Sequence, residues 1–288
     1  MRLHLLDGTY ELFRSHFGAP SRSAPNGMEI GAVHGIMAST LSLLDGGVTH
    51  LGVAFDTVIR SFRNELYDGY KSEAGVPEEL LAQFPIAEEG LEAMGVRVWR
   101  MVEYEADDAL ATAVARFGPE FEQVVVMSPD KDLAQCVDGT RVVGFDRRKG
   151  AFIDAAAVVE KFGVLPESIP DYLGLVGDAS DGFPGVPGWG AKSASVMLAE
   201  YRHIEGIPLE TSLWKPQVRG AERLVTALRA HMADALLFRF LAVLRRDVPL
   251  PEKGAAELAW TGVPRASFED FCERWGFDSL AARPKLWR

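Results

Sequence analysis

The sequence predicts an α/β protein in which a mostly parallel sheet flanked by helices is followed by a helical region. Short apolar runs of strand length alternate with segments of helical spacing through the first 165 residues, a pattern typical of parallel sheets with helical crossovers. After about Pro166 the strand-like runs disappear and helical segments follow one another. A content of 48% hydrophobic residues in a chain of 288 is ample for one large core or two smaller ones.

The first part of the chain alternates predicted strands with predicted helices. Strands are expected at residues 2–6, 50–55, 96–101 and 123–127, and helices at 9–17, 30–44, 86–94 and 105–117. The helical segments repeat apolar residues at a spacing of three to four, as an amphipathic helix requires. Residues 67–85 are mixed in composition and are expected to be irregular.

The second part of the chain is predicted to be helical. Helices are expected at residues 169–176, 191–201, 218–231 and 233–245, with a terminal helix at 268–275. The change from alternating to purely helical patterning predicts a domain boundary near residue 165.

Acidic side chains occur where the predicted strands end or where helices begin. They are Asp7, Asp56, Glu105, Asp107, Asp108, Asp130 and Asp132, and a second pair, Asp178 and Asp181, precedes a glycine-rich turn. Because ligands of parallel sheets lie beyond the carboxyl ends of the strands, we expect these acids to converge there. Divalent cations such as Mg²⁺ take oxygen ligands and only a few carboxylates each, so this number of acids indicates two or more ions. Paired metal ions are suited to phosphodiester hydrolysis.

The glycine-rich segment, residues 177–194, has the pattern of a turn between two helices. Glycines at 185, 188 and 190 allow a hairpin to expose backbone amides at the start of the next helix, where a phosphate can bind. Lys192 adds a cation in the first turn of that helix. A tight interhelical turn without a ligand is the alternative interpretation.

The net charge of −11 neither indicates nor excludes nucleic acid as a ligand. Residues 1–165 carry 15 basic and 25 acidic side chains, and residues 166–288 carry 15 and 16, so the negative charge is concentrated where the acids are expected to bind metal. No apolar run approaches the roughly 20 residues of a membrane span. We therefore expect a cytoplasmic protein that does not bind membranes.

Taken in order, seven segments resemble the structure-specific 5′-nucleases, the family of the flap endonucleases and of the 5′-3′ exonuclease domain of bacterial DNA polymerase I. The segments are LLDGT, FDT, SFR, YDGYKS, YEADD, SPDKDL and GDASDGFPGVPGWGAKSA. The resemblance runs from Asp7 to about Leu198, and the last 90 residues match only loosely. It implies a PIN-like, metal-dependent nuclease domain at 1–165 with an arch at 67–85, and a helical DNA-binding region at 166–288. A helix-three-turn-helix element, similar to a helix-hairpin-helix, is expected at about 170–201.

The resemblance also implies roles for individual residues. All nine acids occupy metal-site positions: Asp7, Asp56, Glu105, Asp107 and Asp130 in the inner part, and Asp108, Asp132, Asp178 and Asp181 completing it. Asp130 is also assigned to catalysis. Lys71 is expected to contact the scissile phosphate, and Arg14 and Arg63 are expected to bind the substrate near the cleavage site. The DNA-binding residues are expected to be Gly185, Val186, Gly188, Trp189, Gly190, Lys192 and Ser193. In relatives the hairpin carbonyls can bind K⁺.

The function that the resemblance implies is Mg²⁺- or Mn²⁺-dependent hydrolysis of DNA at 5′ flaps, nicks or overhangs by two metal ions. It implies a monomer that acts on junctions of single and double strands, in DNA repair or replication, in association with the bacterial nucleoid. Three features depart from the family pattern. Ala74 replaces a usual Arg, the arch has a net charge of −3, and the glycine-rich segment carries Gly182 in place of a usual Asn and Trp189 in place of a smaller aliphatic residue. The Trp189 side chain either faces the core or packs on a sugar. A PIN-type ribonuclease and a noncatalytic protein that binds DNA junctions are the alternatives.

Overall fold

The computed structural model describes all residues from 1 to 288 and contains two compact units. Unit 1 consists of Met1–Ser61, Glu73–Ser128 and Arg246–Arg288, and unit 2 of Phe62–Ser72 and Pro129–Arg245. Each unit therefore combines segments that are far apart in the sequence.

Unit 1 is built on four parallel strands, in the order β3-β2-β1-β4. These strands are β1 (Arg2–Asp7), β2 (Leu51–Asp56), β3 (Arg97–Met101) and β4 (Gln123–Met127). Asp7 pairs with Ala54, and Asp56 pairs with Met101. All four strands thus end at the same edge of the sheet, as their apolar runs predict.

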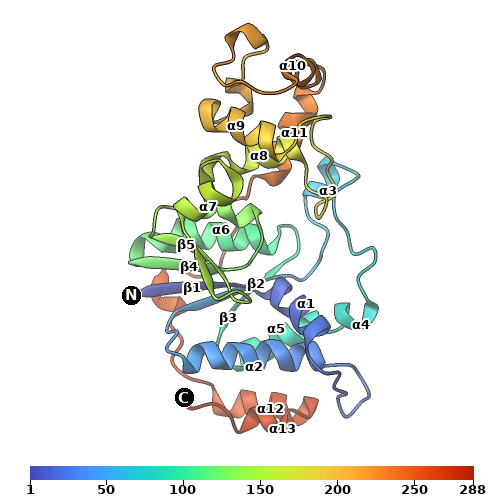
Figure 1. Cartoon of the computed structure of the whole chain (residues 1–288). Coiled ribbons are helices and arrows are strands. Elements are labelled where there is room, and N and C mark those ends of the chain that lie inside the picture. The colour runs from blue at the N-terminus through green and yellow to red at the C-terminus, as the bar shows by residue number, and fades with distance from the viewer. The chain divides into compact units, whose positions relative to one another are not determined.

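Helices cover both faces of this sheet (Figure 1). The helices of unit 1 are α1 (Gly8–Gly18), α2 (Gly31–Asp45), α4 (Glu78–Leu81), α5 (Phe84–Ala93), α6 (Ala106–Phe117), α12 (Arg265–Trp275) and α13 (Asp278–Ala281). Helix α6 lies on one face, and α1, α2 and α5 lie on the other. At Gly90 of α5 a Cβ would be 2.7 Å from the sulfur of Met37 and 2.9 Å from the ring of Phe271. Glycine at this position therefore lets α5 pack tightly between α2 and α12.

The last 43 residues of the chain, Arg246–Arg288, belong to unit 1. The indole of Trp99 donates to Glu252 at 2.9 Å, and the Val248 amide donates to the hydroxyl of Thr112 at 3.2 Å. The sequence assigns this segment to the helical region, because nothing in its composition indicates a return to the sheet. The predicted boundary near residue 165 stays a prediction.

Unit 2 is mainly helical. It contains α3 (Arg63–Leu66), the antiparallel strands β5 (Val142–Asp146) and β6 (Ala151–Ile153), and the helices α7 (Ala155–Phe162), α8 (Ile169–Val176), α9 (Ala191–Tyr201), α10 (Ala221–Ala230) and α11 (Met232–Ala242). The bounds of α8 and α9 are those predicted. Helix α10 begins three residues later than predicted, after Gly220 in a left-handed conformation. The fold class, a mostly parallel sheet flanked by helices and followed by a helical region, is confirmed.

Helices α8 and α11 form the centre of unit 2. A Cβ at Gly174 of α8 would be 2.9 Å from the carbonyl oxygen of Ala235 in α11, so the two backbones touch at this glycine. Phe183 and Phe238 stack beside them with ring centroids 5.6 Å apart. This core fixes the loops that connect α8 to α9.

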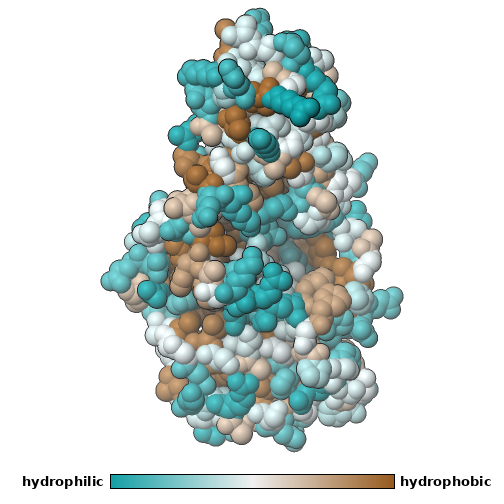
Figure 2. Space-filling model, viewed as in Figure 1, coloured by the Kyte–Doolittle hydropathy of each residue, from teal (hydrophilic) through white to brown (hydrophobic).

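The surface is mostly polar. Figure 2 shows hydrophilic side chains over much of the visible face, with apolar side chains in scattered groups. None of the helices combines the length and the apolar character needed to cross a membrane.

Candidate metal centre and phosphate-binding groove

Asp7 is the last residue of β1 and the N-cap of α1. One oxygen of its carboxylate accepts from the Tyr10 amide at 2.8 Å, and the other accepts from the Ser128 hydroxyl at 2.8 Å. The side chain is buried, with the residue 6% exposed. Because a strand runs directly into a helix here, the helix amides are available to bind the carboxylate.

Asp56 occupies the same position at the end of β2. Its carboxylate accepts from the Ala106 amide, the first residue of α6, at 2.8 Å. Its own amide donates to the hydroxyl of Thr9 in α1 at 2.8 Å. Two strand ends and two helix starts are therefore joined around Asp56.

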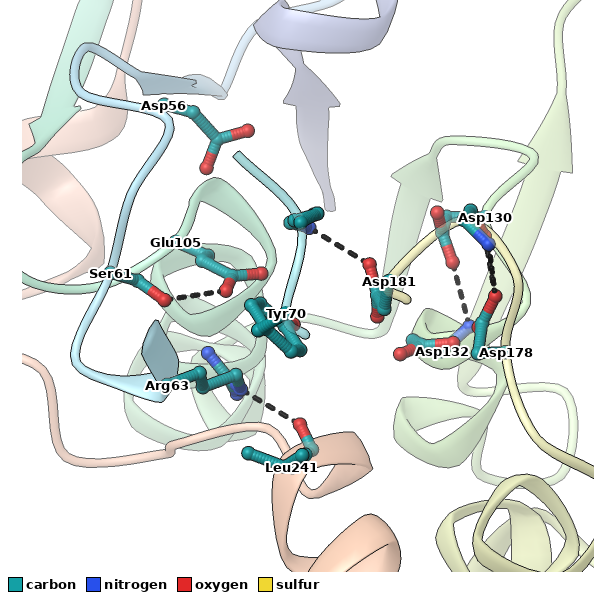
Figure 3. A network of polar contacts seen from close by, with 12 residues as sticks. Asp56, Ser61, Arg63, Tyr70, Glu105, Asp130, Asp132, Asp178, Asp181 and Leu241 are labelled. Carbon is teal, nitrogen blue, oxygen red and sulfur yellow. Dashed lines mark hydrogen bonds and ion pairs between the residues drawn. The ribbon is translucent and has the colours of Figure 1, made fainter. Parts of the chain in front are cut away.

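Glu105 precedes α6 as its N-cap. Its carboxylate accepts from the Ser61 hydroxyl at 2.7 Å (Figure 3), and its amide donates to Asp108 at 3.0 Å. Glu105 and Asp108 thus form a capping box, which satisfies two amides at the start of the helix. Asp107 lies in the same turn and is partly buried. Unit 1 therefore brings its five predicted acids to the edge of the sheet where the strands end.

Three acids of unit 2 form a close group. One carboxylate oxygen from each of Asp132, Asp178 and Asp181 lies within 4.8 Å of the other two. All three residues are buried, with 5%, 2% and 8% exposed. Asp132 begins a 3₁₀ helix, whereas Asp178 and Asp181 lie in the loop after α8 (Figure 3). Asp130 is exposed and accepts from the Asp132 amide at 2.9 Å.

Burial and mutual repulsion place this group under electrostatic strain. Burial raises the pKa of Asp132 well above its ordinary value, and the charges of Asp130, Asp181 and Asp178 raise it further. Burial alone would raise the pKa of Asp178, but hydrogen bonds from Lys131 and Ser180 lower it below its ordinary value. The Oδ1 atom of Asp132 is buried and has no hydrogen-bond partner.

These donors fit a divalent cation. Opposite oxygen ligands of Mg²⁺ are about 4.2 Å apart, because each lies about 2.1 Å from the ion. Oxygens within 4.8 Å of one another reach that span with small side-chain movements. A cation would also satisfy the unpartnered oxygen of Asp132.

Lys71 is fixed to the same group. Its amide donates to the carbonyl oxygen of Asp181 at 3.0 Å, and its ammonium lies 3.2 Å from the Asp181 carboxylate. The two loops meet at Gly182, where φ is +88° and a Cβ would be 2.0 Å from the carbonyl oxygen of Gly69. This contact explains why glycine stands at 182 in place of the asparagine expected from relatives.

The two arginines predicted to grip the substrate differ in their surroundings. Arg14 is partly exposed and pairs with Glu11 at 2.6 Å. Arg63 is fully buried, and its guanidinium donates to the carbonyl oxygens of Leu241 at 2.7 Å and Val243 at 3.0 Å. Figure 3 shows the Leu241 contact. A basic residue in the sequence suggests an exposed cation, and nothing in the sequence signals these carbonyl partners.

The hairpin at 185–190 is a compact turn above the core of unit 2. Gly185 and Gly188 have φ of +72° and +82°, and the Val186 amide donates to the carbonyl oxygen of Leu175 at 2.9 Å. Trp189 is buried, and its indole donates to the carbonyl oxygen of Leu224 at 3.0 Å. Of the two interpretations of Trp189, the structure favours the core-facing one. Its assignment as a DNA contact stays a prediction, as does that of the buried Val186.

A groove of about 660 Å³ opens beside the hairpin at the start of α9. Its lining includes Gly188, Gly190, Lys192 and Ser193, all of them predicted from the sequence. The opposite wall consists of Gln217, Val218 and Arg219. This wall could not be predicted from the sequence, because Val218 and Arg219 are expected in a helix at 218–231 and a single arginine gives no signal of what it faces.

A fold with buried acids, a lysine fixed beside them and a groove at a helix start is compatible with the class of nuclease-like proteins that hold a metal ion. Family models place the chain more closely. Residues 2–163 match the N-terminal resolvase-like domain of 5′-3′ exonucleases, and residues 164–265 match the C-terminal SAM fold of 5′-3′ exonucleases. The chain belongs to the 5′-3′ exonuclease family. The sequence-based recognition of this family, with its PIN-like domain and helical region, is confirmed.

Relatives of known sequence agree with this assignment. The chain is 35% identical over 207 residues to a 5′-3′ exonuclease of Aquifex aeolicus, covering 71% of each chain. It is 35% identical over 284 residues to DNA polymerase I of Bacillus caldotenax, covering 97% of this chain. The chain spans 32% of the length of that polymerase.

Solved structures share the fold at lower identity. The 5′-exonuclease of bacteriophage T5 with bound zinc superposes with a TM-score of 0.69 at 20% identity, covering 95% of this chain and 99% of that one. The catalytic core of Rad2 in complex with DNA substrate has a TM-score of 0.63 at 14% identity, covering 98% and 90%. These likenesses support the fold.

Proposed function

We propose that this chain is a metal-dependent 5′-nuclease that hydrolyses phosphodiester bonds of DNA at 5′ flaps, nicks or overhangs. The observation that carries the proposal is the buried group of Asp132, Asp178 and Asp181, whose oxygens lie within 4.8 Å of one another. The unpartnered oxygen of Asp132 supports a cation as the missing partner. Membership of the 5′-3′ exonuclease family supports the type of reaction.

The proposed cofactors are two or more Mg²⁺ or Mn²⁺ ions. Asp132, Asp178 and Asp181 would hold one ion, and the proposed ligands of the others are Asp7, Asp56, Glu105, Asp107, Asp108 and Asp130. When bound, such ions activate a water molecule and stabilise the leaving oxygen of the phosphodiester. The chain supplies buried carboxylates, which are already fixed by helix caps and loop hydrogen bonds.

Lys71 is proposed to neutralise charge on the reacting phosphate. Its position is set by the backbone bond to Asp181 and by Asn64, whose amide donates to the Lys71 carbonyl oxygen at 2.9 Å. Arg63 anchors the helix that carries Asn64, because its guanidinium binds the end of α11. Arg14 and Arg63 as direct contacts of the substrate remain part of the proposal made from the sequence.

The groove beside the hairpin is proposed to hold the backbone of the DNA duplex. Lys192 and Arg219 supply positive charge, and Gly188 and Gly190 allow close approach of a phosphate.

K⁺ at the hairpin carbonyls is proposed from the family resemblance alone. We also propose a monomer that acts at the nucleoid in DNA repair or replication.

The charge of the arch favours short 5′ ends over long flaps. Glu73, Glu78 and Glu79 are exposed, and they follow Lys71 directly in the chain. Carboxylates repel the phosphates of a single strand, so a long 5′ tail would be bound weakly beside them. We therefore propose that nicks and short overhangs are cut faster than long flaps.

The proposal is tested with 5′-labelled flap, nicked and blunt DNA, each incubated with Mn²⁺ or with EDTA. Cleavage is expected with Mn²⁺, and it should be lost with EDTA and in Asp178→Asn. A matched RNA flap separates this function from a PIN-type ribonuclease, which would cut the RNA at least as fast. Binding of the DNA flap without any cleavage in Mn²⁺ would instead identify a noncatalytic junction-binding protein.

A further inference from the structure

Lys131 stands between two acids in the sequence, but its ammonium is directed to a third. The Nζ atom lies 2.5 Å from Oδ2 of Asp178 and 3.1 Å from the hydroxyl of Ser180. The Asp178 side chain is 2% exposed, whereas that of Lys131 is 32% exposed. The buried carboxylate is therefore paired with a cation that still reaches solvent.

Both oxygens of Asp178 are occupied by groups of the chain. Oδ1 accepts from the amide of Ser180 at 2.9 Å and from its hydroxyl at 2.5 Å, and Oδ2 faces the ammonium of Lys131. Oδ2 of Asp178 and Oδ1 of Asp132 are both buried without a hydrogen-bond partner, but Oδ2 of Asp178 has the ammonium beside it as a counter-charge. Within the group, Asp178 is thus a carboxylate whose charge is already balanced by the chain.

We propose that the ammonium of Lys131 competes with the divalent ion for the Asp178 carboxylate. The competition lowers the affinity of the group formed by Asp132, Asp178 and Asp181 for metal. The inference rests on the metal site of the proposed function. A cation ligated by Asp132, Asp178 and Asp181 would share the Asp178 carboxylate with the ammonium on Oδ2, and two positive charges on one carboxylate repel each other. The flexible stem of lysine lets the ammonium move toward solvent as the metal enters.

Competition predicts opposite effects on stability and on affinity. Without metal, Lys131→Met leaves the buried carboxylates with one counter-charge fewer, so its thermal unfolding midpoint in EDTA should fall by a few degrees, about 2–4 °C per kcal/mol of lost stability. Its affinity for Mn²⁺ should rise by about tenfold, the equivalent of one charged hydrogen bond that no longer has to be broken. A residue that only supports the fold would lower the midpoint and leave the affinity unchanged.

The experiment is a calorimetric titration of the full chain with Mn²⁺ alone, after removal of metals with EDTA and dialysis. The binding step that Asp178→Asn removes is assigned to this group. Lys215→Met is the matched control, because Lys215 pairs with Glu200 at 2.6 Å on the surface, and it should change neither quantity. Lys131→Arg, which keeps the charge, should stay close to the parent chain.

The outcomes separate the two proposals. If Asp178→Asn leaves the titration unchanged, the metal site itself is wrong. If it removes a step but Lys131→Met binds Mn²⁺ with equal or lower affinity, the competition is wrong and the metal site stands. A second measurement on the parent chain does not depend on the folding of a variant: labelling of Lys131 by an amine-reactive reagent, followed by mass spectrometry, should increase when Mn²⁺ is added. Unchanged or decreased labelling would also overturn the competition.

Discussion

The acids of unit 1 and those of unit 2 are held in different ways. In unit 1, amides and hydroxyls of the same unit donate to the carboxylates: the amide of Tyr10 and the hydroxyl of Ser128 donate to Asp7, and the hydroxyl of Ser61 donates to Glu105. In unit 2, the ammonium groups of two lysines lie beside the carboxylates of Asp178 and Asp181. Helix starts fix a carboxylate through oriented amides, whereas the loop of unit 2 adds side-chain charge to the donors of Ser180.

The difference has a consequence for stability. Carboxylates bound by helix amides contribute to folding as N-caps, so they are favourable in the metal-free protein. Asp132 is not compensated in this way, because its pKa is raised by burial and by three neighbouring acids. The acids of unit 1 therefore help the fold, whereas Asp132 opposes it until a cation binds.

The largest expected effect comes from exchanging one acid of each region for its amide. Asp132→Asn and Asp7→Asn should each reduce DNA hydrolysis by about three orders of magnitude, more than the 10- to 100-fold typical of groups that only support a metal ligand. In EDTA, however, Asp132→Asn should raise the unfolding midpoint because it removes repulsion. Asp7→Asn should leave it equal or lower.

Cleavage assays and thermal unfolding in EDTA measure the two effects. An increase in stability for Asp7→Asn, or a decrease for Asp132→Asn, would show that the two regions do not differ as described. Retained hydrolysis in either variant would remove that residue from the metal site.

A second prediction concerns the loop contact that positions Lys71 in unit 2. Gly182→Ala places a methyl group 2.0 Å from the carbonyl oxygen of Gly69, at a φ of +88°. We expect a loss of about 2–4 kcal/mol in the free energy of unfolding, together with reduced hydrolysis as Lys71 moves. Gly75→Ala is the matched control, since Gly75 has a φ of +87° and a methyl group there would meet no atom within 4 Å.

The control isolates the steric contact from backbone strain. Gly75→Ala should cost only about 1 kcal/mol, the strain of a left-handed residue. Denaturant unfolding of both variants gives the comparison. Equal losses would mean that the contact between Gly182 and Gly69 does not fix the loop.

Much of unit 1 could be predicted from the sequence, because its signals are local. The strand Gln123–Met127 contains an uninterrupted apolar run from Val124 to Met127, with a proline two positions later, and Asp7 and Asp56 directly follow similar runs. Their position at one edge then follows from parallel pairing, which the register of Asp7 with Ala54 confirms. Local pattern and sheet topology together were sufficient for these acids.

The contacts that position the residues of the site in unit 2 join distant parts of the chain, and such contacts carry no signal in a single sequence. The buried pairing of Arg63 with Leu241 spans 178 positions. The contact of Gly182 with Gly69 and the pairing of Lys131 with Asp178 arise only after the loops have folded together. The motifs identified which residues matter, but not which of them touch.

A smaller effect is expected in the groove beside α9. Lys192→Ala should weaken binding of duplex DNA by a few fold and reduce the slope of log affinity against log salt by about 0.9, the value for one phosphate contact. Lys215→Ala, on the same unit but paired with Glu200, should change neither. Fluorescence anisotropy at several salt concentrations, with Ca²⁺ in place of Mn²⁺ to prevent cleavage, measures both quantities.

The loss at Lys192 should be the same for different DNA sequences, since a phosphate contact carries no base specificity. A variant that binds as tightly as the parent chain, with the same salt slope, would remove Lys192 from the DNA contact. Reduced binding with an unchanged slope would indicate a change in the shape of the groove instead of a lost charge contact.

The smallest expected effect is the response of unit 1 to mild acid. Burial lowers the pKa of His4 on β1, and the charge of Arg2 lowers it further. The unfolded chain therefore binds the proton more readily than the folded one, so stability is complete above the ordinary histidine pKa of about 6.5 and is lost as the pH falls below it. The loss is limited to about 1.4 kcal/mol per pH unit for one proton.

His4→Gln removes this titration and should flatten the dependence of the free energy of unfolding on pH between about pH 6.5 and 5. Denaturant unfolding in EDTA measures it. Asp132→Asn provides the contrast, because a carboxyl with a raised pKa makes the folded state bind protons and so stabilises it as the pH falls. Removing the Asp132 carboxyl should therefore steepen the loss of stability in acid, whereas removing the His4 imidazole should reduce that loss. If both variants shifted the pH profile of stability in the same direction, protonation would act alike on the two units, and the difference between the acids at the helix starts of unit 1 and the buried group of unit 2 would not extend to their response to pH.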